Sequence, residues 1–337
     1  MRASLSTLAV APLAALLAAC SAPLAPGGAG DSFLHDAAEG ASSAALVVFE
    51  RTVTADDTAH ASTVARFIKM RSGAVDEQTL RMVGATLDLP ALGTCGGAGA
   101  TASDGDQAGD GPRAVELLDV GSVAIEAAGT HTTLEARSLP DIVDLVTGVL
   151  YSTRATALDA LPGRGIYLLH SAGSSGAIDV EHNVAPFDVS ATAPGEPSDL
   201  RIDGQDARAT DGVTLKAGGG VDLAWELGDT SDPDDVVYVE LIAGRSASAD
   251  TATDRPGGPS GPIVANVRCL FADRGVAAIP ASAFVVAERE LTRGTIVVHR
   301  VHRETFQVAA EPASGRTGID SGVVRFDFAR AAEFTRR

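Results

Sequence analysis

The sequence predicts an all-β fold of two β-sandwich domains that follow a signal peptide and a flexible tether. Three observations favour this fold: short segments of alternating apolar and polar residues recur along the chain, Gly, Pro, Asp and Ser separate them, and no long helical pattern alternates with them. Many short strands between turns are typical of a sandwich or barrel rather than a parallel sheet. Apolar residues make up 45% of the 337 positions, which is enough to build cores.

Residues 1–19 have the pattern of a secretory signal peptide. Arg2 is the only charged side chain before Cys20, and the residues between them are mostly Ala and Leu. A basic start, an apolar middle and small residues at the end define such a signal. A membrane-spanning helix needs about 20 apolar residues, and this run is shorter and contains Pro12. We therefore expect a signal peptide rather than a span.

The last four residues of this segment, Leu17-Ala18-Ala19-Cys20, resemble the lipobox of bacterial lipoproteins. The resemblance implies cleavage before Cys20, a diacylglyceryl group on its sulfur and usually a third acyl chain on its amino group. Two or more chains anchor a protein stably to a membrane. Ser21 resembles the residue that directs enterobacterial lipoproteins to the outer membrane, so we expect an exported protein anchored there, on either face. The alternative is a cysteine that ends an ordinary secretory signal.

Residues 20–43 read as a lipidated flexible tether. Pro, Gly, Ala and Ser dominate them, and Phe33 and Leu34 are their only sizeable apolar neighbours. Such a segment buries too little apolar surface to order itself. Its root-mean-square reach is ~25 to 30 Å. The folded part is therefore expected close to the bilayer.

From residue 44 onward the sequence predicts an N-terminal sandwich-like domain over 44–190 and a C-terminal sandwich over 194–337. The boundary is placed in SATAPGEPSD, residues 190–199, because Pro and Gly cluster there. Short helices are expected at Glu77–Val83 and after Ser138, where Ser138–Asp141 resembles a capping box. Strands are expected at 44–53, 62–70, 114–127, 165–170, 221–227, 236–243, 263–271, 295–308 and 322–328.

The C-terminal half resembles fibronectin type III and related immunoglobulin-like sandwiches. The resemblance rests on 197–202, 221–225 and 236–241, and implies that Trp225 on the second strand packs against a third strand that carries Tyr238. The alternation of 221–227 independently places Trp225 and Leu227 on the buried face. The whole chain is similar to multi-β-sandwich lipoproteins of high-GC Gram-negative bacteria, a resemblance that implies no particular chemistry.

The charge of the chain excludes some partners. Lys and Arg number 26 against 44 Asp and Glu, which gives a formal net charge of -18. Such a balance opposes nucleic-acid phosphates and anionic headgroups. Only 10 Phe, 3 Tyr and 1 Trp are present, a small supply of platforms for carbohydrate stacking. The expected partners are the membrane, through the lipid on Cys20, and a protein whose identity the sequence does not give.

Two acidic loops are the candidate calcium sites. Asp104, Asp106 and Asp110 have the spacing of a calcium loop. An EF-hand also needs an oxygen ligand at position five and Glu at position twelve, but Ala108 and Val115 occupy these places. The second loop, with Asp229, Asp232, Asp234 and Asp235, joins two expected strands. We expect solvated acidic loops in both places, and therefore no metal.

His299 and His302 have the HxxH spacing of a zinc pair. Their surroundings predict a strand, and residues three apart on a strand face opposite sides. A shared metal would need a local bulge. We therefore expect no metal and no cofactor here.

Lipidation of Cys20 leaves Cys95 and Cys269 as the only thiols. Cys269 alternates with apolar residues, which predicts a buried core thiol. A bridge needs Cα atoms within about 7 Å of each other, and no sequence pattern brings these two cysteines together. We therefore predict two free thiols rather than a disulfide.

Motifs of enzymes are missing from the sequence. GSSG at 173–176 and GPSGP at 258–262 do not match G-x-S-x-G, and HExxH, P-loop and dinucleotide fingerprints do not occur. The prediction is a non-enzymatic, lipid-anchored structural or protein-interaction module of the cell envelope. One alternative is an envelope hydrolase, since triads are assembled in space. The other is a calcium-dependent adhesion module, which convergence of the two acidic loops would favour.

Overall fold

The computed structural model describes residues 42–70, 75, 86–97, 115–142, 146–153, 161–174, 183–228, 232–243, 266–286 and 289–337. Within these ranges the regular elements are strands, apart from two short 3-10 helices, η3 (Ala281–Phe284) and η4 (Pro312–Ser314). The predicted all-β sandwich fold is confirmed. The signal peptide, Cys20, the tether up to residue 41, the helix expected at Glu77–Val83 and the loop with Asp104, Asp106 and Asp110 lie outside the described residues.

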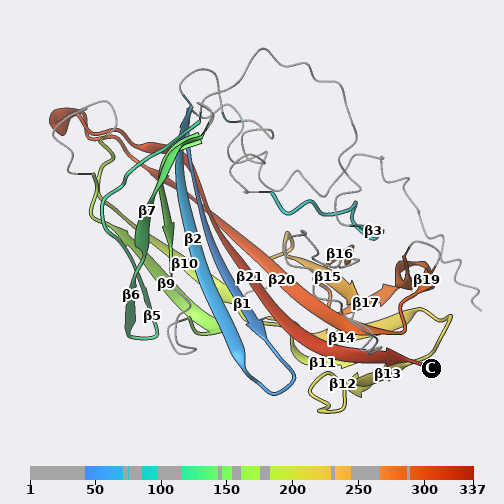
Figure 1. The fold of residues 1–337 in the computed structure, drawn as a ribbon. Coiled ribbons are helices and arrows are strands. Elements are labelled where there is room, and N and C mark those ends of the chain that lie inside the picture. Colours follow the sequence, from blue (N-terminus) through green and yellow to red (C-terminus); the bar gives the residue numbers. More distant parts are fainter. Residues whose placement is uncertain are drawn as a thin grey trace, which may run out of the picture.

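One sheet of eleven strands runs through the whole molecule (Figure 1). Its centre is the antiparallel pair of long strands β20 (Arg293–Val308) and β21 (Ile319–Arg336). Strand β1 (Ser43–Val53) lies parallel to β21, and β2 (Ala59–Met70) is antiparallel to β1. The strand order is β3-β16-β15-β20-β21-β1-β2-β4-β8-β7, and β13 pairs with β21. The remaining bounds are β3 (Cys95–Gly97), β4 (Val115–Leu117), β7 (Glu135–Ile142), β8 (Val146–Ser152), β13 (Val213–Leu215), β15 (Val236–Ala243) and β16 (Asn266–Ala272).

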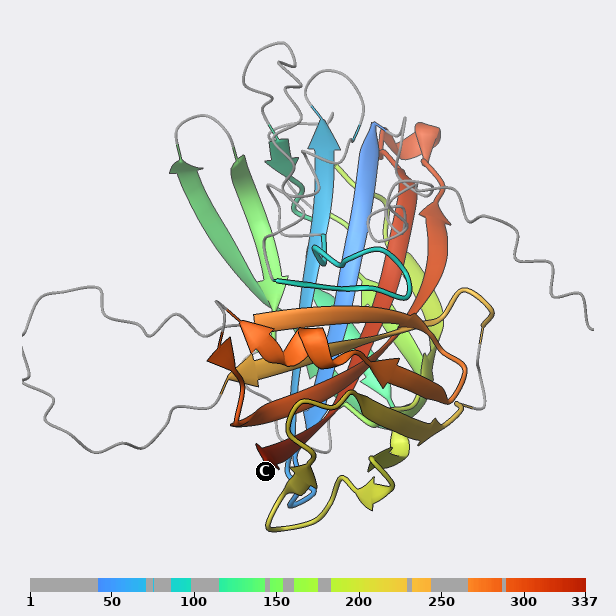
Figure 2. The ribbon, with the colours of Figure 1, turned by 90° about the vertical axis from the view of Figure 1, so that its right-hand side faces the viewer.

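Two four-stranded sheets cover different stretches of this long sheet (Figures 1 and 2). The first has the order β10-β9-β5-β6 and the second the order β12-β11-β14-β17. A separate two-stranded sheet pairs β18 with β19. Their bounds are β5 (Val123–Ala127), β6 (Thr130–Thr133), β9 (Arg164–Ser171), β10 (Phe187–Pro194), β11 (Ser198–Ile202), β12 (Gln205–Asp206), β14 (Val221–Glu226), β17 (Val276–Ile279), β18 (Val285–Val286) and β19 (Arg289–Glu290).

The described residues form four hydrophobic clusters, and the long strands supply side chains to the two largest, which we call the two cores. Phe326 and Phe328 of β21 lie in the core under the first small sheet, whereas Ala332 and Phe334 of the same strand lie in the core under the second. All four share one face, because their numbers differ by two or by multiples of two. One continuous face of β21 therefore joins the two cores.

This arrangement corrects the prediction of separate sandwiches at 44–190 and 194–337. Strand β10 runs into the expected boundary as far as Pro194, and only Gly195–Pro197 separates it from β11. The expected last strand, 322–328, is longer at both ends and reaches from one core into the other. Its second part was missed because the small and polar residues at 329–333 weaken the apolar alternation.

Several expected strands are found close to their predicted bounds, but the strand predicted at 114–127 and the helix predicted after Ser138 are wrong. The segment 114–127 is split into β4 and β5 around Gly121, which has a φ of 78° and lies so close to the Gly173 carbonyl that a Cβ would meet its oxygen at 2.2 Å. The segment with Ser138 is strand β7 instead of a helix. Strand β7 is at the edge of its sheet, where Pro140, which has no N–H, is tolerated.

Trp225 is buried at 5% exposure, as the sequence predicts, whereas Leu227 is 45% exposed. Strand β14 ends at Glu226, so the alternation that predicts an inward Leu227 stops one residue too early. The chain then passes Pro194 so closely at Gly228 that a Cβ there would lie 2.4 Å from the Pro194 carbonyl oxygen. This close approach requires glycine and ends the strand.

Candidate functional site

His299 and His302 point to opposite sides of the long sheet, as the strand spacing predicts. Both belong to β20, whose pairing with β21 is regular up to Phe306. His299 pairs with Asp327, and His302 pairs with Asp235. The two imidazoles therefore do not share a ligand. In the described part of the chain, no group of three or more His, Cys, Asp or Glu residues is placed to hold a metal ion.

On one face, Tyr238, His299 and Asp327 form a buried cluster. The Tyr238 hydroxyl donates to Asp327 Oδ2 at 2.7 Å, and His299 Nδ1 lies 2.7 Å from Asp327 Oδ1. The Tyr238 and His299 rings stack with centroids 4.1 Å apart. Burial would raise the pKa of Asp327. The charge and hydrogen bond of His299, together with the charge of Arg325 and the hydrogen bond from Tyr238, outweigh this effect, and the pKa of Asp327 is lowered. Burial and the neighbouring charge of Asp327 raise the pKa of Tyr238 well above its ordinary value.

This cluster differs from the triad of a hydrolase. Asp327 orients His299 as a triad carboxylate would, but its second partner is Tyr238. The other ring nitrogen of His299, Nε2, is buried without a hydrogen-bond partner among the described side chains. A nucleophile would have to lie at that nitrogen. The described geometry instead ties three neighbouring strands, β15, β20 and β21, together.

On the opposite face of β20, a second polar cluster lies between the two hydrophobic cores. His302 Nδ1 is 2.6 Å from Asp235 Oδ1, and its Nε2 is 3.5 Å from Glu304 Oε1. Glu304 also accepts a hydrogen bond from the backbone N–H of Thr192 at 2.6 Å. Burial opposes the charged imidazole, but the hydrogen bonds and charges of Asp235 and Glu304 outweigh it, so the pKa of His302 is raised.

Arg300 extends this cluster under the connection between β10 and β11. Its guanidinium is fully buried and donates to Asp273 Oδ2 at 2.6 Å. It also donates to the Glu226 carbonyl at 2.7 Å and to those of Gly195 and Glu196 at 3.2 and 3.3 Å. Trp225 Nε1 donates to the other oxygen of Asp273 at 2.6 Å. Two of these bonds, those of Glu226 and Trp225, join β14 of the second small sheet to the long-sheet residues Arg300 and Asp273, and two others hold the β10–β11 connection.

The described part of the second acidic loop is used internally. Asp235 binds His302 and accepts the backbone N–H of Asp232, whose own side chain accepts the N–H of Asp234. Asp229 lies outside the described residues, as do Asp104, Asp106 and Asp110. The carboxylates of Asp232 and Asp235 therefore order their own turn.

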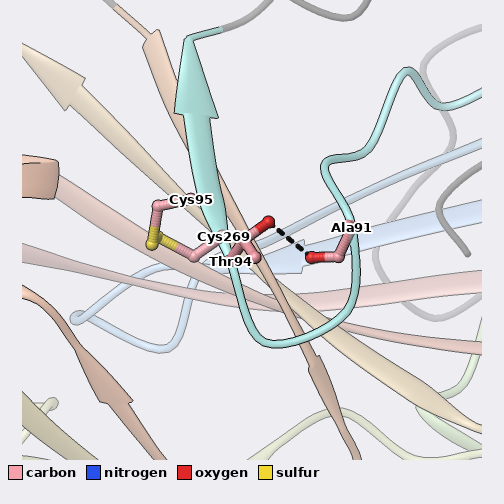
Figure 3. The surroundings of a disulfide bond; sticks show 4 residues. All are labelled: Ala91, Thr94, Cys95 and Cys269. Atoms are coloured by element: carbon pink, nitrogen blue, oxygen red, sulfur yellow. Dashed lines mark hydrogen bonds between the residues drawn. A yellow bond between two sulfur atoms is a disulfide. The ribbon is translucent and has the colours of Figure 1, made fainter. Parts of the chain in front are cut away.

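Cys95 and Cys269 form a disulfide, which corrects the prediction of two free thiols (Figure 3). The two residues lie directly opposite each other on β3 and β16, with Cα atoms 3.9 Å apart. The backbone bond from the Leu270 N–H to the Thr94 carbonyl identifies their position as a non-hydrogen-bonded pair, in which opposite side chains approach most closely. The pairing was invisible in the sequence because 174 positions separate the two cysteines.

The edge of the second small sheet at β17 carries exposed apolar side chains. Among the described strands, β17 pairs only with β14 and ends the sheet. Val276 on this strand is 64% exposed, and Leu227 beside it is 45% exposed. Leu227 lies beside Gly275, the residue before Val276, since a Cβ on Gly275 would lie 3.5 Å from Leu227 Cγ. Two of the exposed large apolar side chains of the described chain are thus found at the same end of β17.

A shallow hollow of about 490 Å³ lies on the outer face of this sheet, next to the edge. Most of the residues that line it are small or apolar, and Arg201 and Asp222 are the charged ones. No motif of the sequence predicts this surface. The signal that could have found it is the short segment Val276–Ile279, in which the exposed positions are apolar instead of charged. The residues that line the hollow are Arg201, Gly204, Asp222, Leu223, Ala224, Val276, Ala277 and Ala278.

A second hollow, of about 510 Å³, lies under the turn between β1 and β2. Asp56 at its rim is occupied by its own turn, where it accepts hydrogen bonds from Thr54 and Thr58. These bonds lower the pKa of Asp56. We therefore take the surface at β17 as the candidate functional site.

Comparison with known proteins adds no family. No protein-family model matches the chain, and no curated protein is similar to it in sequence. Among solved structures, the Fcho1 Mu homology domain of Danio rerio, determined with a bound peptide, is similar at 12% identity and a TM-score of 0.24, over 90% of this chain and 99% of that one. A likeness of this size supports no inference about function. Among the described residues, no helix is long and apolar enough to cross a membrane.

Proposed function

We propose that this chain is a protein-interaction module of the cell envelope, held at a membrane by lipid on Cys20. The observation that supports this function best is the unpaired edge of β17 with exposed Val276 and Leu227 beside the hollow. Natural sheets usually protect such edges with charged residues, Pro or bulges. An edge that shows apolar side chains instead is suited to binding another chain.

Two features support the envelope location. The lipobox Leu17–Cys20 addresses the chain to lipidation and, by the identity of Ser21, to the outer membrane. The Cys95–Cys269 disulfide suits the oxidising compartments outside the cytosol, where such bonds persist. These features are independent of each other, because one depends on the signal segment and the other on the folded part.

The polar cluster of His302, Asp235 and Glu304, with Arg300 and Asp273 beside it, is here called the polar junction. It supports a scaffold role for the rest of the molecule. Arg300 binds the ends of β14 and β16 and the Gly195–Glu196 connection at once. Buried charge pairs of this kind hold one arrangement of elements, since breaking them leaves an unpaired charge away from water. The sheet that carries β17 is therefore presented in a fixed position relative to the long sheet.

The test uses the full chain in its own bacterium. Metabolic labelling with an alkyne fatty acid should mark the wild type and not Cys20→Ser, which should also leave the membrane fraction. A photoreactive side chain at Val276 should give a discrete adduct, and purified lipid-free chain added as competitor should reduce it. The same probe at Ile166, which is 61% exposed on the other small sheet, is the matched control. Equal adducts at both positions, or none at Val276, would contradict the interaction function.

A further inference from the structure

We propose that the partner binds as an extended segment that adds a strand to the open edge of β17 and carries a basic side chain toward Asp222. This inference rests on the proposed function and names its binding mode and the chemistry of its partner. Strand addition obtains affinity from main-chain hydrogen bonds and specificity from the side chains that lie over adjoining pockets.

The backbone register leaves unused groups on the outer side of β17. The Trp225 N–H donates to the Gly275 carbonyl at 2.8 Å, so this pair is hydrogen-bonded. Because bonding alternates along an antiparallel pair, Ala277 and Ile279 also bond to β14. The N–H and C=O groups of Val276 and Ala278 therefore point away from β14. No described residue forms a backbone hydrogen bond with them outside the strand pairs.

The side chains around this edge leave room for a partner strand. A strand added to β17 lies about 4.8 Å from it, so its outward side chains lean over Val276, Ala278 and the hollow behind them. Ala224 and Gly204 keep the hollow open because neither has a side chain larger than a methyl group. A branched or long side chain of the partner fits there and covers the exposed Leu227 and Val276.

The charges on this face select a basic partner. Asp222 stands directly opposite Ala278 on the adjacent strand, and its carboxylate forms no hydrogen bond or salt bridge with a described residue. Asp203 and Glu226 are exposed on or beside the same face, whereas Asp199 pairs with Arg208, and Arg201 is the basic residue that lines the hollow. A Lys or Arg on the added strand reaches Asp222 across β17. An acidic segment would meet repulsion at the same place.

The first test removes one main-chain donor. Ala278→Pro deletes the outward N–H and keeps the bonds to β14, since Pro is tolerated on edge strands where the N–H faces solvent. Ala278→Ser keeps the N–H and is the matched control. A random 12-residue peptide library displayed on phage, selected on the purified lipid-free chain, supplies the probe. We expect enriched peptides with alternating apolar residues and at least one Lys or Arg.

The selected peptides, made synthetically, should bind the wild type and Ala278→Ser equally. They should bind Ala278→Pro about five- to tenfold more weakly, as expected for one lost hydrogen bond. Asp222→Asn should weaken basic peptides at low salt and leave their apolar variants unchanged. Hydrogen exchange should show the Val276 and Ala278 amides becoming protected on binding, a readout that needs no variant to fold.

Three results would overturn strand addition: failure to enrich any peptide, enrichment of acidic peptides, or equal binding to Ala278→Pro and the wild type. The cellular adduct separates this inference from the proposed function. An adduct at Val276 that persists undiminished in Ala278→Pro keeps the interaction function and removes strand addition. Absence of the adduct in the wild type removes the interaction function itself.

Discussion

Arg300 shows how a charged residue can occupy the centre of this molecule. Its guanidinium and the carboxylate of Asp273 are 0% and 1% exposed. Removing two such charges from water is costly unless every polar atom finds a partner. The Asp273 carboxylate binds Trp225 as well as Arg300, and three carbonyl oxygens accept three further guanidinium protons, so that each guanidinium nitrogen has a partner. The pair therefore joins β14, the end of β16 and β20 at one point.

His302 makes stability depend on pH. Two carboxylates, those of Asp235 and Glu304, face the His302 imidazole. Arg300 lies on the same side of β20. The neighbours from the adjoining strands, Phe326 of β21 and Thr192 of β10, are uncharged. Its folded pKa is raised above 6.5, so the folded state binds the proton more tightly than the unfolded state. Protonated His302 therefore adds to the free energy of unfolding. This stabilisation is fully present below the pKa of histidine in the unfolded chain and is lost as pH rises through the pKa of His302 in the folded protein.

We therefore expect the difference in unfolding free energy between the wild type and His302→Gln to shrink as pH rises above 6.5. Urea denaturation on both sides of that pH measures it. His170→Gln is the control, because this exposed histidine lies far from the junction and pairs with an exposed Asp188. A difference that stays constant with pH, or grows, would contradict the role of His302.

For single residues, the sequence predicts only on which side of its strand a side chain lies. The inward position of Trp225 and the opposed His299 and His302 follow from the two-residue period of a strand. The partners of these side chains do not follow, because Asp235 is 67 positions from His302 and Asp273 is 48 positions from Trp225. Such contacts depend on the order of strands in the sheet, which no local pattern encodes.

Strand β3 shows how an element can depend on a covalent bond. It has three residues, and β16 is its one partner among the described strands. The disulfide closes a loop of 174 residues, for which the chain-entropy treatment gives about 5 kcal/mol of stabilisation. The segment before β3 also places Leu89 against Tyr238, Leu270 and Val301. Loss of the disulfide would release one end of the segment that holds Leu89 over these apolar side chains.

Reduction should therefore lower the unfolding free energy of the wild type by up to about 5 kcal/mol. Cys95→Ser should show the lower stability without reductant and should not respond to it. Guanidinium denaturation with and without a phosphine reductant measures both. Equal stability of oxidised and reduced wild type would show that β3 is held by its backbone bonds alone.

Among the elements, long alternating strands were predictable and short ones were not. The segments 236–243 and 295–308 alternate over many residues and match β15 and β20 closely. Strands of two to five residues, such as β12, β13 and β17, contain too few positions for a period to show. Strand β7 was read as a helix because a capping pattern around Ser138 outweighed its weak alternation, and only its edge position explains Pro140.

The two cores form one cooperative unit because β20 and β21 belong to both. A fragment of residues 194–337 would expose Phe326 and Phe328, which in the whole chain are buried against Phe49 and Tyr167. We expect this fragment alone to lack a cooperative unfolding transition and to show water-like Trp225 emission. Adding residues 42–193 as a second fragment should restore blue-shifted emission. A fragment that unfolds cooperatively by itself would support the separate domains that the sequence predicts.

The parallel pairing of β1 with β21 also constrains the order in which the chain can fold. The backbone N–H groups of Ser42 and Ser43 donate hydrogen bonds to Asp320, 278 and 277 positions further along the chain. The first described strand, β1, therefore cannot complete its pairing until the last strand, β21, is available. Contacts of such separation form slowly, because loop closure must precede them. A chain threaded through a membrane from its N-terminus would emerge with β1 unpaired and both apolar cores incomplete until β21 followed. Until then the exposed strand edges and apolar side chains of such a chain are open to aggregation, whichever way the chain is delivered.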